Sequence, residues 1–283
     1  MKLFDAHCHL QDDLLFPDLG NVLERAAAAG VERIVVCGTS PDDWAQVLQC
    51  PKKEKYALTL SVGIHPWFCS EHCHSLRSLP HHDSDEASLA SLGWKENFQT
   101  LEEMVRADAT GEKGAPMLSV GIGECGLDFS ERFKNRAEQE ECFAAHLDLA
   151  RELNRPVTVH CVQAWGRLIE ILREHPAPKI VLHAFGGAVE LIPELSELNC
   201  WFSFCGNVTN PNAKRVRAAA VAVPAERLLI ETDSPDFPPA GCEAPNEPAN
   251  LIVVARAVAE LRGVSVEEIA ELTFTNASHV FRV

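Results

Sequence analysis

The stretch Phe4-Asp5-Ala6-His7-Cys8-His9 ends a short apolar lead and carries two histidines separated by one residue. If residues 3–9 form a β-strand and its exit, alternate side chains point to opposite faces, so His7 and His9 share a face and Cys8 points away. Two neutral imidazoles at a strand end can bind one divalent cation. Taken alone, the pair is equally compatible with two solvated loop histidines, so the rest of the chain has to decide.

The composition indicates a globular protein. The chain has 283 residues, of which 46% are hydrophobic, and a formal net charge of −16. This charge argues against a protein that coats nucleic acid without regard to sequence, because such proteins are basic. It does not exclude an enzyme that meets a phosphate through bound metal ions, which supply local positive charge.

The cysteines and the first residues predict the compartment. The chain has 11 cysteines, an odd number, and several lie in apolar runs typical of strands. Free thiols in a reducing compartment are therefore expected, and disulfides are the alternative. Met1 leads almost directly into a predicted strand without a leader, and the apolar runs are too short for a membrane span. We expect a cytoplasmic monomer without membrane contact, with a nuclear location as the alternative in a eukaryote.

Strand and helix patterns alternate along most of the chain. Gly30 ends the first predicted helix, and Ser40 with Asp43 forms the start of a capping box before the second. Alternating strands and helices imply parallel strands with crossover helices. The predicted strands are residues 3–9, 31–36, 56–62, 117–121, 157–160, 180–183, 200–204 and 228–231. We predict a single (β/α)8 TIM-barrel domain over residues 1–283, with extra helices at the C-terminal end.

Residues 69–116 interrupt this alternation after the third strand. The segment is rich in histidine and lacks an apolar period until a predicted helix at residues 96–106. Cys69 and Cys73 suggest a zinc knuckle, but their spacing to the nearby histidines fits no standard ligand pattern. We expect a solvated surface insertion. The histidines concerned are His72, His74, His81 and His82.

Six polar residues fall at or just past the predicted strand ends. Singly, His160 could bond a neighbouring strand, Glu124 could cap a helix, and Asp233 could shape a turn. Together they lie on the C-terminal face of the predicted barrel, where active sites of this fold are built. Burying all six unpaired would cost several kcal/mol, whereas metal coordination removes that cost, and six ligands suit two ions that share a carboxylate. The six are His7, His9, Glu124, His160, His183 and Asp233.

The chain resembles the TatD-type metal-dependent deoxyribonucleases, which are amidohydrolase-like barrels. The resemblance runs nearly end to end outside the insertion, with weaker support from Asn246-Glu247-Pro248-Ala249-Asn250 and Thr275-Asn276-Ala277. It is carried by Asp5-Ala6-His7-Cys8-His9, Gly63-Ile64-His65-Pro66, Gly123-Glu124-Cys125-Gly126-Leu127-Asp128, His160, His183-Ala184-Phe185-Gly186-Gly187 and Glu231-Thr232-Asp233-Ser234-Pro235.

The resemblance implies a role for each site residue. His7, His9, Glu124 and Asp233 would hold one divalent ion, and Glu124, His160 and His183 a second, with Glu124 bridging. Asp233 would also orient or deprotonate the attacking water, and His65 would lie beside the substrate phosphate. The implied activity is 3'-5' exonuclease cleavage of DNA, at an end or in a single strand, by metal-activated water. The family suggests Mg²⁺ as the working ion, whereas four imidazoles favour Zn²⁺ or Mn²⁺.

Two departures from the family pattern leave the substrate open. After His160 the family often has Ser-Arg-Glu-Ala, where this chain has Cys161-Val162-Gln163-Ala164, and Gly241-Cys242-Glu243-Ala244-Pro245 replaces a basic segment. Both changes remove positive charge. A metal-dependent hydrolase of a small ester, lactone or amide is therefore the alternative, and a scaffold without catalysis is disfavoured by the complete ligand set.

Two basic clusters could still contact a phosphate backbone. One follows the fourth predicted strand and the other follows the seventh. They are equally compatible with ordinary charges on helix faces. The clusters are Arg132, Lys134 and Arg136, and Lys214, Arg215 and Arg217.

Overall fold

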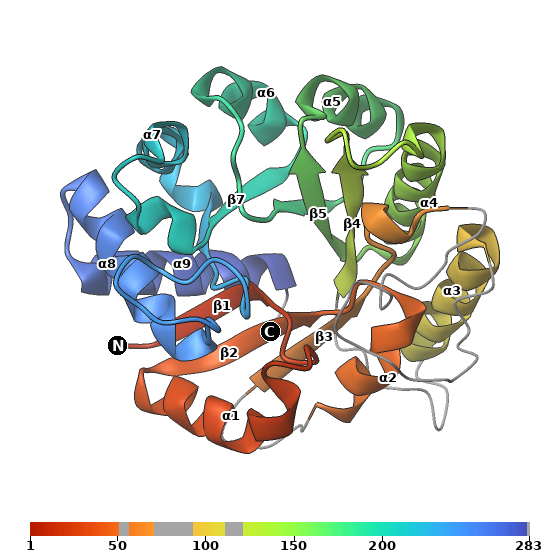
Figure 1. The fold of residues 1–283 in the computed structure, drawn as a ribbon. Helices are drawn as coiled ribbons and strands as arrows, with labels where there is room; N and C mark the ends of the chain where they lie inside the picture. Colours follow the sequence, from red (N-terminus) through yellow and green to blue (C-terminus); the bar gives the residue numbers. More distant parts are fainter. Residues whose placement is uncertain (51–56, 71–92, 111–120, 282–283) are drawn as a thin grey trace.

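A computed structural model describes residues 1–50, 57–70, 93–110 and 121–281 of the chain (Figure 1). Eight parallel strands follow one another around a nearly closed barrel in sequence order, with helices outside them. This confirms the predicted (β/α)8 TIM barrel. The strands are β1 Leu3–Cys8, β2 Val31–Cys37, β3 Ala57–Val62, β4 Gly121–Asp128, β5 Pro156–Val162, β6 Lys179–Leu182, β7 Cys200–Phe204 and β8 Leu228–Ile230.

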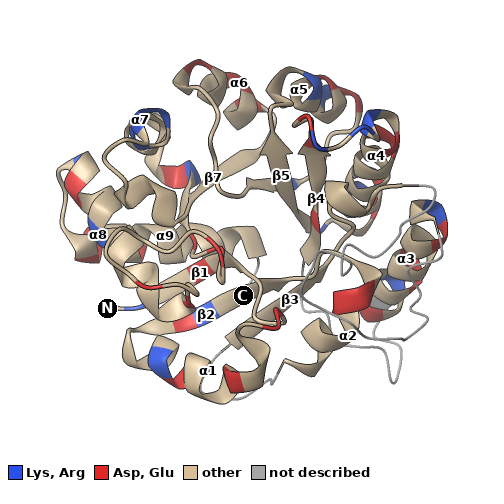
Figure 2. Ribbon diagram, in the orientation of Figure 1, with Lys and Arg blue, Asp and Glu red and all other residues tan. Residues whose placement is uncertain are grey.

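The helices cover the outside of the barrel and carry most of the charged residues (Figure 2). The capping box before α2 is present, with the Asp43 carboxylate accepting from the backbone N–H groups of Thr39 and Ser40. No helix in the described ranges has both the length and the apolar character that a membrane span needs. The helices are α1 Leu19–Ala28, α2 Pro41–Gln49, α3 Trp94–Thr110, α4 Arg136–Leu153, α5 Trp165–Glu174, α6 Ile192–Glu197, α7 Lys214–Ala222, α8 Leu251–Arg262 and α9 Val266–Phe281.

The helix α9 lies beyond the regular alternation and packs against β1 and β8. The ring of Phe4 in β1 lies 5.8 Å from the ring of Phe274 and 5.9 Å from that of Phe281. These aromatic contacts bury the outer side of β1. The extra C-terminal helix thus holds the strand on which the first histidine pair depends.

The first and last strands meet through two backbone hydrogen bonds rather than a regular ladder. The N–H of Asp233 donates to the carbonyl oxygen of His7 over 3.0 Å, and the N–H of His9 donates to that of Ser234 over 2.8 Å. Both bonds are made by residues of, or next to, the predicted site. Closure of the barrel therefore also sets the positions of His7, His9 and Asp233.

The fourth strand differs from the prediction. Its predicted end at Gly121 is wrong, because β4 begins there and runs to Asp128, while residues 117–120 lie outside the described residues. The glycines of this strand allow close packing against its neighbours. A Cβ atom on Gly123 would lie only 2.5 Å from the carbonyl oxygen of Thr158 in β5. Glu124 therefore lies inside a strand and not in the loop after it.

Part of the predicted insertion is an ordinary barrel helix. Its described residues form α3, which packs beside α4 through the ion pairs Lys95–Glu141 at 3.1 Å and Arg106–Glu152 at 2.6 Å. The Sγ atom of Cys69 is buried and donates to the carbonyl oxygen of His65. The other members of the suggested zinc knuckle lie outside the described residues, so that alternative and the limits of the insertion stay predictions. They are Cys73, His72, His74, His81 and His82.

Candidate metal centre

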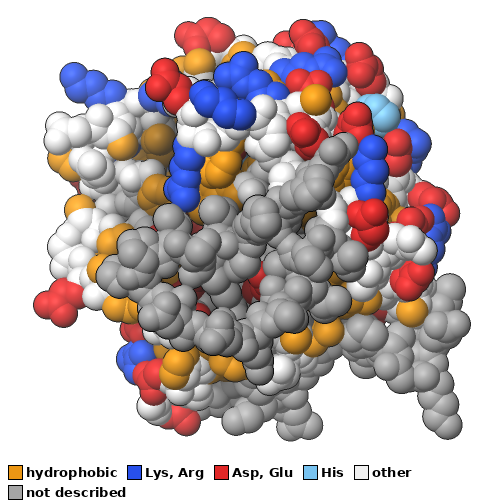
Figure 3. Space-filling view, turned by 45° about the vertical axis from the view of Figure 1, so that its right-hand side comes forward, with side chains coloured by type: hydrophobic (Ala, Val, Ile, Leu, Met, Phe, Trp, Pro, Cys, Tyr) orange, Lys and Arg blue, Asp and Glu red, His pale blue; other side chains and the backbone are white. Residues whose placement is uncertain are grey.

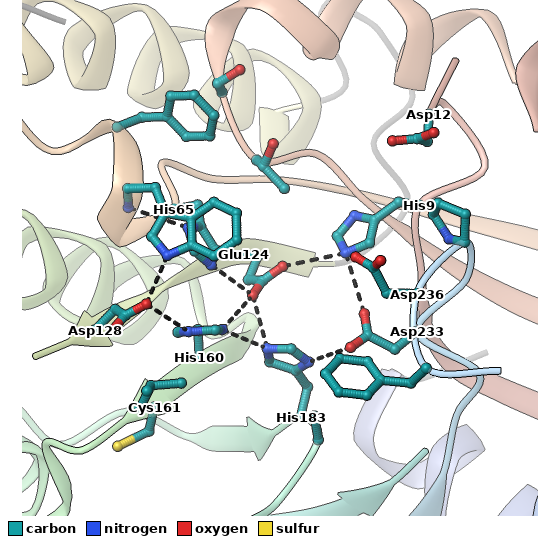
Figure 4. A pocket seen from close by; sticks show the side chains of 18 of the residues that line it. His9, Asp12, His65, Glu124, Asp128, His160, Cys161, His183, Asp233 and Asp236 are labelled. Atoms are coloured by element: carbon teal, nitrogen blue, oxygen red, sulfur yellow. Dashed lines mark hydrogen bonds and ion pairs between the residues drawn. The ribbon is translucent and has the colours of Figure 1, made fainter. Parts of the chain in front are cut away.

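Four side chains from β1, from β4 and from the segments that follow β1 and β8 meet in a first cluster (Figure 4). The Nε2 atoms of His7 and His9 lie 3.1 Å apart. Each lies 3.4 Å from Oδ1 of Asp233, and they lie 3.4 and 3.5 Å from Oε2 of Glu124. One oxygen from each carboxylate therefore faces the same two imidazole nitrogens.

The other carboxylate oxygen of Glu124 faces a second cluster. Its Oε1 atom lies 2.8 Å from Nε2 of His183 and 3.1 Å from Nδ1 of His160. The two imidazole nitrogens lie 3.1 Å from each other. Because the two oxygens of Glu124 serve different clusters, its carboxylate bridges them (Figure 4).

The spacing of both clusters fits divalent cations. Four ligands about 2.1 Å from a central ion lie roughly 3.4 Å apart in a tetrahedron and about 3.0 Å apart in an octahedron. The measured separations in the first cluster run from 3.1 to 3.5 Å. The Nδ1 atom of His9 lies 2.8 Å from the carbonyl oxygen of Cys37, which can only accept. Nδ1 therefore carries the proton and leaves Nε2 free as a ligand atom, the usual arrangement of metal-binding histidines.

His65 has the opposite tautomer to His9. Its Nδ1 atom accepts a hydrogen bond of 3.2 Å from the backbone N–H of Trp67. Burial lowers the pKa of His65 to about 4, so the ring is neutral and its proton lies on Nε2. That N–H points at Oε1 of Glu124, 3.3 Å away. His65 is thus arranged as a donor beside the cluster.

The buried carboxylates of Asp233 and Glu124 are ionised at neutral pH and can bind cations. Burial raises the pKa of Asp233, but its hydrogen bond with His9 and the nearby histidines outweigh this and lower it to about 2. Burial likewise opposes ionisation of Glu124, yet the charge of His183 and the hydrogen bonds from His160 and His183 bring its pKa well below the usual value. In return, the charge of Glu124 outweighs the effect of burial on His183 and raises its pKa to about 10. A divalent ion would replace protons held in this way.

The clusters lie in an open cavity of about 960 Å³. His9, Glu124, His160, His183 and Asp233 line it, as does His65, whereas His7 is fully buried behind them. The structure therefore brings together all six predicted ligands and His65.

Of the six residues in the two predicted basic clusters, only Arg215 is among the described residues that line the cavity. Arg132 lies at its edge, with its guanidinium 5.6 Å from the ring of Trp67, which does line it. Figure 3 shows basic side chains in the upper part of the face it displays, mixed with acidic ones. Lys134 and Lys214 are exposed and are not among the described lining residues. The expected concentration of positive charge at the site is thus smaller than the sequence suggested.

The departure from the family pattern after His160 lies at the cavity. Cys161, Val162 and Gln163 all line it, so the position where an arginine was expected is part of its wall. Cys8 and Cys125 are fully buried in the core, as strand alternation predicts. Cys161 is half-buried at the wall, with its sulfur directed away from Glu124 (Figure 4).

Three further residues support the site and had no predicted role. The Oδ2 atom of Asp128 accepts a 2.7 Å bond from Nε1 of Trp67 and lies 3.9 Å from Nε2 of His160. Glu231 accepts from the backbone N–H of Ala184 and lies 3.8 Å from Nδ1 of His183. Asp128 and Glu231 lie in the motifs that carry the family resemblance, and this was the only indication in the sequence of a role for them. Sequence spacing does not reveal contacts between different strands.

The chain is similar to known proteins over nearly its whole length. A family model described as "TatD related DNase" matches residues 4–282. The "uncharacterized metal-dependent hydrolase YabD" of Bacillus subtilis is 31% identical over 99% of this chain and 99% of its own. The "3'-5' ssDNA/RNA exonuclease TatD" of Pectobacterium atrosepticum is 30% identical over 99% of this chain and 100% of its own. The crystal structure of YJJV, a TatD homolog from Escherichia coli, superposes with a TM-score of 0.81 at 27% identity, covering 99% of this chain and 98% of that one.

Proposed function

The chain belongs to the family of TatD-related DNases, and on this premise we propose that it hydrolyses phosphodiesters of DNA from the 3' end with divalent metal ions. The observation that carries the proposal is the carboxylate of Glu124, whose two oxygens face two separate clusters of imidazoles. Enzymes that use two ions for phosphodiester hydrolysis need such a bridge, because the ions have to lie close together.

The ligand assignment follows the two clusters. His7, His9, Glu124 and Asp233 would hold one ion, and Glu124, His160 and His183 would hold the other. When bound, the ions would acidify a water near neutral pH and neutralise the phosphoryl oxygens. We propose Mg²⁺ as the working ion, with Mn²⁺ and Zn²⁺ as the ions that the imidazoles also accept.

The chain supplies the proton acceptor and a donor. The pKa of Asp233 is lowered to about 2, so its carboxylate is ionised at neutral pH and can take the proton of the attacking water. The Nε2–H group of His65 lies in the cavity wall beside Glu124 and donates to a phosphoryl oxygen of the substrate. Burial keeps His65 neutral, so it acts as a hydrogen-bond donor and not as a charge.

We further propose that the protein acts as a cytoplasmic monomer, with the nucleus as the alternative in a eukaryotic cell. All ten cysteines in the described part of the chain are free thiols. Free, mostly buried thiols are typical of proteins from reducing compartments.

A nuclease assay tests the proposal. Purified protein, stripped of metal and reloaded with Mg²⁺, Mn²⁺ or Zn²⁺, is incubated with a single-stranded oligonucleotide labelled at its 5' end. Stepwise shortening from the 3' end in at least one metal, and none with chelator, is the expected result. Hydrolysis of small esters, lactones or amides without any cleavage of DNA would replace the proposal with the small-substrate alternative, which the acidic cavity wall favours.

A further inference from the structure

Two aromatic rings that the proposed chemistry does not use are exposed in the cavity wall. Trp67 follows β3 and Phe237 follows β8, and each side chain is 40% exposed. Scattered exposed apolar residues need no explanation, but these two lie in the same cavity as the metal clusters. A ring that stays in water beside a buried site offers an apolar face to a ligand.

The ring of Trp67 is held in place on several sides. Its Nε1–H group donates to Asp128, and its ring stacks on Phe133 with 5.6 Å between centroids and 17° between planes. His65 contacts it edge-on at 4.7 Å, and the guanidinium of Arg132 lies 5.6 Å from its centroid. The exposed face is therefore presented in a fixed orientation, which lowers the entropy cost of binding.

The loop of Phe237 is held at a cost in backbone energy. Its φ of 50° lies in the left-handed region, which bulky residues rarely adopt. The Nδ2 group of Asn246 donates to the carbonyl oxygens of Asp236 and Phe237. A Cβ atom at position 206 would collide with the Phe237 carbonyl, so the close approach requires Gly206. A strained conformation that exposes an aromatic ring points to a binding role.

The charges of the cavity wall favour stacking over phosphate contacts. Outside the metal clusters, the described lining contains one arginine, Arg215, and several aspartates. Such a wall attracts a phosphate backbone weakly. Stacking of a base on an aromatic ring needs no positive charge and tolerates every base. The aspartates on the wall are Asp12, Asp13, Asp42, Asp43, Asp128 and Asp236.

We infer that Trp67 and Phe237 are specificity-determining residues that stack on unpaired bases of the substrate strand. Inside a duplex, base faces are covered by neighbouring pairs, so neither ring can reach them there. The inference rests on the proposed nuclease function and adds the residues that contact the bases of its substrate. Both rings act as binding residues and need no contact with the scissile phosphate.

The test measures whether loss of a ring and loss of one base have coupled effects on kcat/KM. Single-stranded oligonucleotides carry an abasic tetrahydrofuran at one of the terminal positions, and kcat/KM is compared with that of the intact strand. In the wild type, loss of a contacted base should lower kcat/KM roughly tenfold to hundredfold. In Trp67→Ala and Phe237→Ala, the penalty at the position each ring contacts should disappear, and the preference for single strands over a blunt duplex should fall.

Matched variants separate stacking from other effects. Trp67→Phe keeps a ring but loses the bond to Asp128, so it should retain most of the abasic penalty. Val221→Ala removes an exposed apolar side chain on α7 that does not line the cavity, and should change nothing. An unchanged abasic penalty in both alanine variants, or equal cleavage of duplex and single strand by the wild type, would overturn the inference.

Binding by fluorescence anisotropy distinguishes this inference from the proposed function. If the wild type cleaves no oligonucleotide, the nuclease proposal fails, yet base-dependent binding that Trp67→Ala abolishes would still support the stacking role. Binding that is equal for intact and abasic strands would overturn it.

Discussion

The carboxylate of Asp5 in β1 accepts two hydrogen bonds from Thr232, one from its backbone N–H at 2.8 Å and one from its hydroxyl at 2.6 Å. Both residues are fully buried. Asp5 lies two residues before His7, and Thr232 lies one residue before Asp233. The contact therefore ties the two chain segments that carry ligands of the first proposed ion.

Thr232→Val tests this tie, because it removes the hydroxyl donor while keeping the shape of the side chain. Loss of a hydrogen bond to a buried carboxylate should lower the free energy of unfolding by about 2 kcal/mol. It should also weaken metal binding, since His7 and Asp233 would no longer be held in register. Urea unfolding and metal titration measure the two effects. Thr100→Val on the exposed side of α3 is the control, and equal losses in both variants would contradict the tie.

Glu124→Ala should reduce the metal content at both sites and abolish turnover, because one carboxylate faces both clusters. Metal analysis after dialysis measures the stoichiometry. Glu138→Ala on α4 removes an acidic residue away from the clusters and should retain the full content. A variant of Glu124 that keeps its metals and full activity would contradict the ligand assignment.

Asp233→Asn is the comparison that separates metal binding from proton transfer. The proposed ligands of the second ion are Glu124, His160 and His183 and do not include Asp233, so the variant should keep at least one ion. An amide cannot take the proton of the attacking water, so most activity should be lost. If Asp233→Asn lost both ions, as Glu124→Ala is expected to, metal loss alone would explain its inactivity, and full activity in Asp233→Asn would contradict the role in proton transfer.

Charge neutralisation tests the predicted basic contacts. Two double variants are made, Arg132→Gln with Lys134→Gln and Lys214→Gln with Arg215→Gln. Each should weaken DNA binding and flatten its salt dependence by roughly one unit per lost phosphate contact. Arg215 lines the cavity, so Arg215→Gln alone should account for most of the effect of its pair. Hydrolysis of a small chromogenic phosphodiester should barely change. An unchanged salt slope in every variant would remove these residues from substrate binding.

The sequence predicted the barrel and the polar residues of the site, but not how they are held. Hydrophobic periods and caps located seven strands closely, because each strand is a local pattern. The fourth was placed too early: Gly123 and Gly126 allow a close approach of β4 to β5, Gly121 allows one to Ser61 of β3, and only the folded barrel creates these approaches. The proton position on His65 depends on the N–H of Trp67, and no sequence pattern encodes it. The Trp67–Asp128 contact likewise joins the segment after β3 to the end of β4.

His146 on α4 links the outer layer to the loop that carries His65. Its Nδ1 atom lies 2.7 Å from the carbonyl oxygen of Cys142, and its Nε2 atom accepts from the backbone N–H of Ile64. The ring is fully buried, and burial lowers its pKa to about 4 from an ordinary value of 6.5. As a neutral ring it satisfies both partners, whereas a protonated ring would lose the bond to Ile64.

This arrangement predicts a loss of stability in acid. Below pH 6.5 the unfolded chain binds a proton at His146, whereas the folded chain binds it only near pH 4. Stability that is present at pH 7 is therefore lost as the pH falls from 6.5 to about 4. At pH 5 the loss amounts to about 2 kcal/mol.

His146→Gln keeps an acceptor for Ile64 without titrating, so its free energy of unfolding should fall less from pH 7 to pH 5. Denaturant unfolding with chelator present, so that metal release does not contribute, gives the comparison. His175→Gln at the end of α5 removes a partly exposed imidazole and should not reduce the loss. An acid-side loss in His146→Gln as large as that of the wild type would show that this ring does not stay neutral in the folded protein.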